Sequence, residues 1–239
     1  MQLVWSDEFN GSGAVNSTNW FHQTQLPAGG SWYNNEVQHY TNRQINSFVN
    51  NGFLNIVAKR ETFTNQGQTK QFTSARLNSK FAFKYGRVEV RAKMPTGLGT
   101  WPAIWMLSEK DIYPNQNNGE MDIMERLNHD GFAYQTTHNH ATITLKQETP
   151  KKYNTGKIDP SDYNTYSVSW YPDKLVYAIN GIETITYPKV AGGSTCQWPF
   201  DQPFYLIIDQ QLEGSWPGKV TNLKELPINM TVDWVKLYQ

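Results

Sequence analysis

Short segments of alternating apolar and polar residues, separated by turn-forming clusters, run through the whole chain. The clearest of these segments are Phe53–Ala58, Gly86–Lys93, Thr165–Trp170, Leu175–Ile179 and Met230–Tyr238. Because successive side chains of a strand point to opposite faces, this alternation predicts strands that bury one face. No segment shows a long apolar period of 3.6 residues, so any helix should be short. The pattern predicts an all-β fold, with antiparallel sheets packed as a sandwich.

Local signals add detail to this sandwich. The pair Asn180-Gly181 follows a predicted strand and is typical of a tight hairpin turn. The strand-like segments at the two ends of the chain, 3–5 and 230–238, are expected to pair with each other. A short helix is expected over 159–163, with Asp159 as its N-cap and Pro160 in its first position.

Length and composition limit the function. The chain has 239 residues, a length at which all-β sandwiches commonly form one domain, and we interpret residues 1–239 as one. Lysine plus arginine equals aspartate plus glutamate, at 21 each, so we expect no nucleic acid and a partner that is neutral or whose charge is bound locally. Cys196 is the only cysteine and is expected to be a small buried residue outside any disulfide. We expect a monomer.

Neither a membrane-length apolar run nor a signal peptide is recognised in the sequence. We expect an exported protein whose signal lies outside this sequence, although a cytoplasmic protein would have the same features.

Three carboxylates, Glu120, Asp122 and Glu125, lie within six residues among apolar side chains. Strand alternation places the first two on one face, while the apolar residues between them point into the core. Glu125 is out of phase by one residue, and a single β-bulge near Met124 would return it to the carboxylate face. Acids this close push their pKa values apart, so one can be charged while another holds a proton. Glycoside hydrolysis requires such a pair, whereas a solvated acidic edge strand is the structural alternative.

The acid motif follows the run Trp-Pro-Ala-Ile-Trp-Met-Leu at 101–107, and together they resemble glycoside hydrolase family 16. Similarity extends over almost the whole chain. The further segments that carry it are 4–9, 32–41, 74–76, 84–89 and 232–235.

The resemblance implies a β-jelly roll of two curved antiparallel sheets with an open cleft across the concave one. It also implies retaining, endo-acting cleavage of β-linked polysaccharides. By position, Glu120 resembles the nucleophile and Glu125 the general acid/base, while Asp122 resembles the residue that tunes Glu120 through a proton or hydrogen bond. The extra residue Met124 makes the motif similar to the laminarinase side of the family; compact lichenases and xyloglucan transglycosylases lack it.

Eight further residues are expected to bind substrate. They are Asn35, Arg76, Trp101, Trp105, His138, Gln211, Glu213 and Trp216. The two tryptophans of 101–107 share a face and could belong to the core or to the cleft; the resemblance favours Trp105 near the cleaved bond. Trp216 resembles a loop residue that stacks on the nonreducing side. His138 matches a family histidine beside the acid/base, although a lone histidine is more often structural.

Polar side chains complete this set. Arg76, Asn35 and Gln211 can hydrogen-bond sugar hydroxyls, and a salt bridge to one of the acids is an alternative for Arg76. Glu213 replaces a small residue at the cleft edge, where it would block or recognise a substituent.

Family members often bind a structural calcium at the terminal strands. The resemblance implies Glu8, Asp233 and a backbone carbonyl near Gly52 as its oxygen ligands, with a pair of ordinary surface acids as the alternative. No cofactor is expected for catalysis.

These observations predict a secreted or periplasmic retaining endo-β-glycanase that acts on a β-1,3 or mixed β-1,3/1,4 glucan. Segments 125–128 and 134–138 also resemble members that act on mixed-linkage glucan or mucin O-glycans. An endo-β-1,4-galactosidase acting on poly-N-acetyllactosamine is therefore the alternative enzyme. A lectin-like sugar-binding module is the competing class, because jelly rolls also host lectins.

Overall fold

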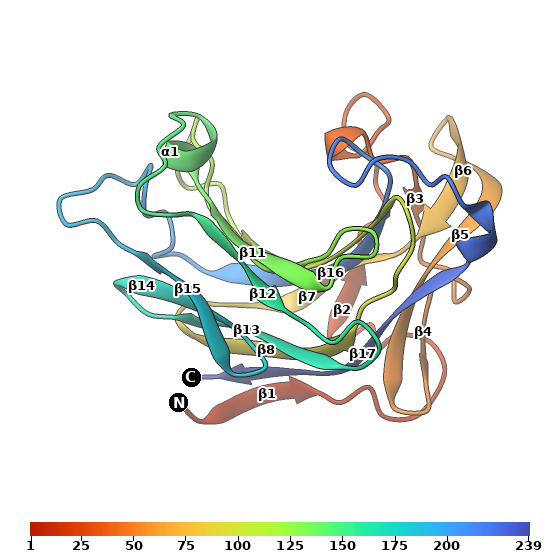
Figure 1. Cartoon of the computed structure of the whole chain (residues 1–239), viewed down its shortest axis with the longest axis horizontal. Coiled ribbons are helices and arrows are strands. Elements are labelled where there is room, and N and C mark those ends of the chain that lie inside the picture. Colours follow the sequence, from red (N-terminus) through yellow and green to blue (C-terminus); the bar gives the residue numbers. More distant parts are fainter.

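The computed structural model describes residues 1–239, and two stacked sheets contain most of them (Figure 1). One sheet has ten strands and the other has seven. Neighbouring strands are antiparallel throughout, except for one short parallel pair formed by 39–40 and 73–74. The sheets are open and match a jelly roll, so the predicted all-β sandwich is confirmed.

The ten-stranded sheet forms the lower layer in Figure 1 and rises on the right-hand side. Its strands are β1 (Leu3–Asp7), β3 (His39–Tyr40), β4 (Ser47–Asn50), β5 (Phe53–Asn65), β6 (Gln68–Ser74), β8 (Gly86–Lys93), β13 (Asn164–Trp170), β14 (Lys174–Ile179), β15 (Ile182–Pro188) and β17 (Ile228–Tyr238). They lie in the order β15-β14-β13-β8-β17-β5-β6-β3. In addition, β1 pairs with β17 and β4 pairs with β5.

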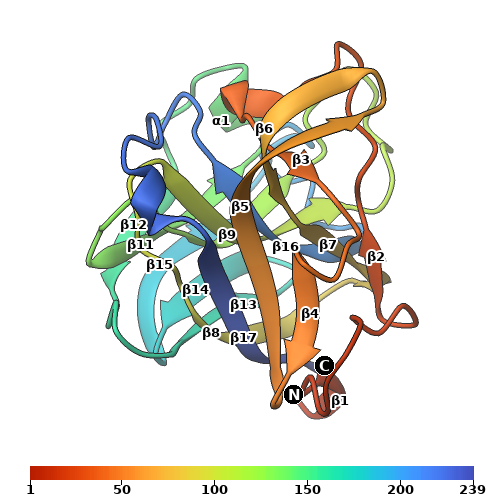
Figure 2. The ribbon, with the colours of Figure 1, turned by 90° about the vertical axis from the view of Figure 1, so that its right-hand side faces the viewer.

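The seven-stranded sheet lies above it. Its strands are β2 (Trp20–His22), β7 (Arg76–Phe83), β9 (Thr100–Ser108), β10 (Glu120–Glu125), β11 (Phe132–His138), β12 (Tyr153–Lys157) and β16 (Phe204–Leu212). They lie in the order β12-β11-β10-β9-β16-β7-β2. The helix α1 (His140–Ile143) rises beside β11, while the 3₁₀ turn η1 (Tyr33–Asn35) and strand β6 rise on the opposite side (Figure 1). A second 3₁₀ turn, η2 (Leu223–Glu225), precedes β17. Figure 2 shows β5 and its partner β6 extending to the top of the view.

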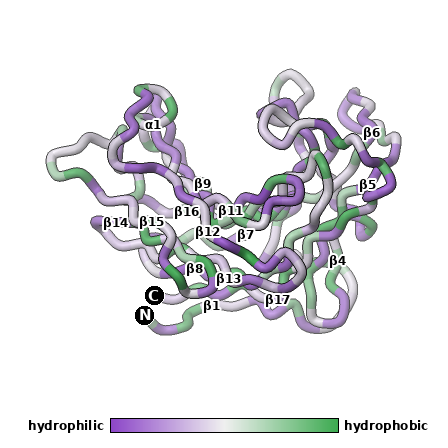
Figure 3. Tube along the Cα trace, in the orientation of Figure 1, coloured by the Kyte–Doolittle hydropathy of each residue, from purple (hydrophilic) through white to green (hydrophobic).

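The core lies between the two sheets and forms one cluster of 37 buried residues. Figure 3 shows hydrophobic and hydrophilic residues alternating along the strands, as a half-buried sheet requires. On β9, Ile104 and Met106 are fully buried in this core. Fully burying such a side chain contributes about 1.5–3 kcal/mol. The other face of β9 is therefore free to carry the site.

Several local expectations are confirmed. Asn180 and Gly181, at φ values of 51° and 76°, form the tight turn between β14 and β15. Strands β1 and β17 pair antiparallel, which joins the two ends of the chain.

Two local expectations are wrong. Residues 159–163 form a turn, because the Asp159 carboxylate accepts hydrogen bonds from the backbone and hydroxyl of Ser161 and closes the chain before β13. The α-helix instead begins after Asn139, whose side chain accepts from the backbone of Thr142. Cys196 is half-buried rather than buried, with its Sγ 3.4 Å from Oε1 of Gln116.

No helix combines the length and the apolar character needed to cross a membrane.

Candidate active site

The three acids lie on β10, which contains a β-bulge. Against β9, Asp122 pairs with Trp105 and Met124 pairs with the next residue along, Ile104, so β10 holds one extra residue. The pairing with β11 shifts over the same stretch. Ile123 and Met124 are both fully buried in the core. The bulge expected near Met124 is confirmed, and it turns Glu125 onto the same face as Glu120 and Asp122.

The acids lie between two hollows on this face of the seven-stranded sheet. The first, which we call the arginine hollow, has a volume of about 160 Å³, and its lining includes Tyr33, Glu36, Arg76, Trp105 and Gln211. The second, the lysine hollow, has a volume of about 600 Å³, and its lining includes Tyr134, His138, Lys152, Tyr153 and Trp216. Asn34, Trp101, Glu120 and Glu125 border both. The two hollows together form one cleft with the acids at its centre.

Burial controls the protonation of the acids. It raises the pKa of Glu120 to about 8, and the charge of Asp122 adds to the rise. Burial also raises the pKa of Asp122 to about 7. The interaction between these two carboxyls raises the pKa of Glu120 and lowers that of Asp122.

Glu125 is set apart from this pair by its hydrogen bond. Burial, and then the charge of Asp122, raises its pKa well above the ordinary value. The indole Nε1 of Trp101 donates to Glu125 Oε1 over 2.9 Å and opposes that rise. On the other side, His138 Nε2 lies 3.2 Å from Asp122 Oδ2. The cleft therefore holds three buried carboxyls whose pKa values are all raised.

Arg76 is held in place by aromatic rings. Its guanidinium lies 4.7 Å from the ring centre of Trp105 and 5.5 Å from that of Trp32. Its Nη1 lies 4.0 Å from Asp209, so the acid it faces is not one of the three on β10. Asp209 is fully buried, accepts from Trp105 and Gln211, and has a pKa raised to about 6 by burial.

Sequence reasoning missed Glu36. Its carboxylate lines the arginine hollow and accepts from Gln38 over 2.8 Å and from Tyr40 over 3.2 Å. Burial and the nearby charge of Asp209 raise its pKa to about 7. The sequence signal that could have found it is the spacing of Glu36, Gln38 and Tyr40, which carry polar groups at every second position. Alternate residues of an extended segment lie on one face, so these polar groups should lie together.

The expected substrate-binding residues divide between the hollows. Trp101 and Trp105 share the cleft face, as alternation predicts, and Trp101 is 6% exposed. Trp216 is 42% exposed and packs against Trp101 and Tyr134, with ring centres 5.5 and 4.7 Å away. It lies in the lysine hollow with His138.

Two of the expected residues lie off the walls of the cleft. Asn35 lines neither hollow, and its neighbour Asn34 lines both. Glu213 also lines neither; it adopts a φ of 57°, and its carboxylate accepts from the backbone of Val220, which closes the loop after β16.

The calcium site expected at the terminal strands stays a prediction. Glu8 faces Lys236, with Oε1 3.4 Å from Nζ, and Asp233 forms an ion pair with Arg91. Gly52 lies in the turn between β4 and β5. Each carboxylate has a cationic partner in this arrangement, which a calcium ion would have to displace. The ligand atoms that do lie within 4.8 Å of one another belong to Glu120, Asp122 and His138, which are the acid cluster itself.

Comparisons with known proteins agree with this geometry. The sequence model of glycosyl hydrolases family 16 matches residues 33–236. The keratan-sulfate endo-1,4-beta-galactosidase of Sphingobacterium multivorum is 36% identical over 242 residues, which cover 100% of this chain and 55% of that protein. The beta-glucanase of Rhodothermus marinus is 33% identical over 257 residues, which cover 100% of this chain and 85% of that protein.

The fold comparison gives the same result. The X-ray structure of the laminarinase from Rhodothermus marinus superposes with a TM-score of 0.89 at 33% identity, covering 100% of this chain and 97% of the other. This chain spans about half the length of the Sphingobacterium protein. With a family match over most of its length and relatives above 30% identity, the chain belongs to glycosyl hydrolases family 16.

Proposed function

We propose that residues 1–239 form the catalytic domain of a retaining endo-β-glycanase that cuts internal bonds of a β-1,3 or mixed β-1,3/1,4 glucan. The observation that carries the proposal is the bulge of β10, which gathers Glu120, Asp122 and Glu125 between two hollows. A polysaccharide that occupies both hollows extends past the acids in both directions. Cleavage at the acids is then internal to the chain.

In the first step the Glu120 carboxylate attacks the anomeric carbon, and the bond from that carbon to the leaving oxygen breaks. Glu125 gives its proton to that oxygen, so the shorter glycan leaves as an alcohol. In the second step water attacks the same carbon, Glu125 takes the proton of the water, and Glu120 is released as a carboxylate. Two displacements retain the anomeric configuration.

The neighbouring residues support these roles. We assign a proton to Asp122 before attack and after release, so that a hydrogen bond from Asp122 stabilises the charge of Glu120. Trp101 orients Glu125 through its 2.9 Å hydrogen bond. His138, beside Asp122, moderates the negative charge of the cluster. A lectin has no use for several acids kept partly protonated at the centre of its cleft.

The arginine hollow is the part of the cleft that we assign to the nonreducing side, because 32–41 resembles the glycone-side loop. Trp216 then belongs to the leaving-group side, which differs from its expected place on the nonreducing side. Polymeric substrates of this kind are met outside the cytoplasm, so we propose that the enzyme acts after export.

An endo-β-1,4-galactosidase is the second candidate. The relative named as a keratan-sulfate endo-1,4-beta-galactosidase is 36% identical across this chain, compared with 33% for the beta-glucanase. Product chromatography on laminarin, mixed-linkage glucan and desulfated keratan would separate the candidates. We expect oligosaccharides from at least one polymer; release of monosaccharides alone would contradict endo action.

Substitution of the two glutamates tests the mechanism. Glu120→Ala should abolish turnover with retention, and azide should give an inverted glycosyl azide. Glu125→Ala should lower polysaccharide hydrolysis about 10²–10⁴-fold, while an aryl glycoside with a good leaving group keeps its first step. Azide should then give a retained product. The opposite stereochemistries would reverse the two roles, and full activity of both variants would refute the proposal.

A further inference from the structure

The lysine hollow contains a cationic side chain that forms no ion pair. Lys152 is half-buried and lines this hollow, yet it forms none of the six ion pairs of the structure. Its backbone carbonyl accepts from the amide of Thr137 over 2.8 Å, which fixes this segment against β11. The residue is therefore held beside the cleft by the sheet, while its ammonium group has no protein carboxylate to neutralise it.

The other cationic side chains of the cleft differ in this respect. Arg76 lies between two aromatic rings and faces Asp209, and His138 lies 3.2 Å from Asp122. Both influence the acids, since each lowers the pKa of Glu120, whereas Lys152 is not among the main influences on the pKa of any of the three acids on β10. A role in stabilising the charges of the acids on β10 therefore does not explain why Lys152 lines this hollow.

The dimensions of the hollow indicate what it can receive. Its volume of about 600 Å³ exceeds the 160 Å³ of the arginine hollow, so it has room for a sugar that carries a bulky group. The aromatic rings of Trp216 and Tyr153 are 42% and 46% exposed there and offer apolar surfaces for the faces of sugar rings. An anion would be repelled by the Glu120 carboxylate and attracted towards Lys152, which restricts its position.

We propose that Lys152 recognises an anionic substituent, a sulfate ester or a carboxylate, on the sugar bound in the lysine hollow. This inference rests on the proposed function, because it assigns a substrate class to the leaving-group side of the same cleft. A lysine ammonium is a compact charge with three donors, suited to either kind of oxyanion. A neutral glycan still binds through the aromatic residues, so the lysine acts on preference rather than on turnover itself.

The test uses one glycan in three forms: sulfated keratan, its desulfated product, and the desulfated glycan oxidised at its primary hydroxyls to carboxylates. Lys152→Met keeps the length of the side chain and removes the charge. We expect kcat/KM on the anionic forms to fall about two- to fivefold relative to the desulfated form, as for loss of one partly exposed ion pair. Lys152→Arg should retain the preference for at least one anionic form. Equal losses on all three forms would overturn the inference.

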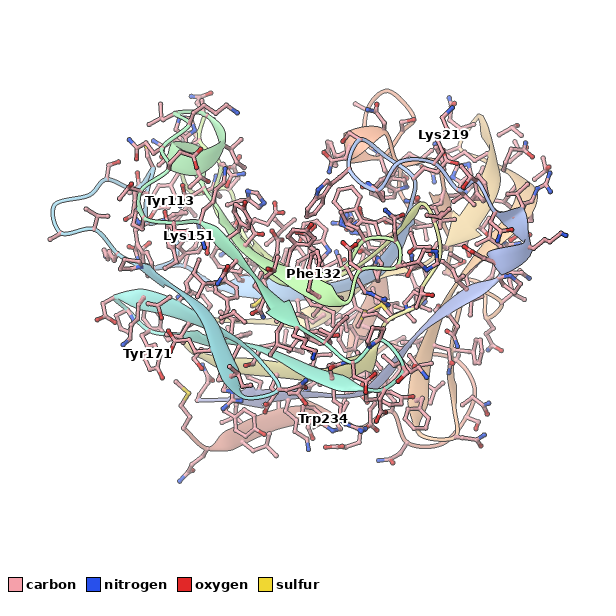
Figure 4. All side chains as sticks on the ribbon, in the orientation of Figure 1. Tyr113, Phe132, Lys151, Tyr171, Lys219 and Trp234 are labelled. Atoms are coloured by element: carbon pink, nitrogen blue, oxygen red, sulfur yellow. The ribbon has the colours of Figure 1, made fainter.

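Lys151→Met is the matched control. Lys151, labelled in Figure 4 on the β12 side of the molecule, is exposed, has its Nζ 3.2 Å from the Asn154 side chain, and does not line the hollow. This variant should leave the ratio of anionic to neutral turnover unchanged. A change as large as that of Lys152→Met would show a general surface-charge effect and overturn the assignment to Lys152.

Binding separates this inference from the proposed function. Titration calorimetry of the Glu120→Gln variant with the three glycans requires no turnover. Tighter binding of an anionic form, lost in the Glu120→Gln, Lys152→Met double variant, would support the inference even if no glycan were hydrolysed. Equal affinity for all three forms would overturn it even if the enzyme proved to be an active glycanase.

Discussion

Trp101 is the residue through which the protonation of Glu125 can be adjusted. Its indole N–H donates to the carboxylate and lowers the pKa of Glu125. Trp101→Phe removes this donor, so the pKa should rise and the basic limb of the kcat/KM profile should move to higher pH. Activity should fall tenfold or more, because a hydrogen bond to a charged group contributes about 1.5–3 kcal/mol. Rates measured from pH 5 to pH 10 would check both effects.

Trp216→Phe is the control for this variant. Trp216 packs edge-on against Trp101 but has no hydrogen bond to Glu125. It should change KM and leave the basic limb where it is. A basic limb that moves equally in both variants would mean that packing, rather than the hydrogen bond, controls the proton of Glu125.

Single residues were predictable where a local pattern located them. The acid motif has its own spacing, and Trp101 and Trp105 follow from alternation along one strand. Glu36 and Lys152 were not recovered, because their roles depend on tertiary contacts: Glu36 on Asp209, which is distant in sequence, and Lys152 on the approach of its segment to β11. One sequence does not determine such long-range neighbours.

The bulge of β10 makes a prediction at the scale of one element. It turns Met124 into the core, so Met124→Ala should leave a cavity and lower the free energy of unfolding by about 2–5 kcal/mol. Activity below the melting range should stay within a few-fold of the parent. Denaturant unfolding and rates on the same samples would check it. If Met124 faced the cleft instead, activity would fall while stability stayed nearly constant.

Ile112→Ala provides a comparison outside the core. Ile112 is 47% exposed, and its truncation should change the free energy of unfolding by no more than about 0.5 kcal/mol.

The bulge and the helix show why one element could be predicted and the other could not. Glu125 was out of phase with Glu120 and Asp122 in an otherwise regular strand, and one β-bulge is enough to return it to their face. Residues 159–163 carry good helix-starting signals, yet Asp159 uses its carboxylate to bind Ser161 and closes a turn. An aspartate side chain can accept backbone hydrogen bonds both at the start of a helix and in a turn. The start of β13 at Asn164 leaves no room for a helix here.

At the scale of the molecule, alternation was enough to predict two sheets and an internal core. The pairing of β1 with β17 also followed, since both segments are strand-like and lie at the two ends of the chain. The order of strands within each sheet did not, because neighbours such as β8 and β17 are separated by more than 130 residues and share no local signal. That order is what brings Arg76 on β7 and His138 on β11 to opposite sides of the acids.

The buried acids of the cleft make the whole fold sensitive to pH. The pKa is raised to about 8 for Glu120 and to about 7 for Asp122 and Glu36, against ordinary values near 4. At a pH between the ordinary and the raised pKa values, the folded protein holds more protons than the unfolded chain, so its stability decreases as pH rises. His22 and His39 have lowered pKa values and oppose this trend only near and below pH 6.5.

We therefore expect the melting temperature to fall steadily from pH 6.5 to pH 8.5. Glu36→Gln should reduce this fall, because a neutral amide still accepts from Gln38 and Tyr40 but cannot ionise. The exposed Glu109 is the control, and Glu109→Gln should leave the slope unchanged. Calorimetric scans at constant ionic strength would measure all three proteins. A melting temperature that stays flat or rises over this interval would mean that the acids ionise without penalty, and the cleft would then lack the protonated carboxyl that the proposed first step requires.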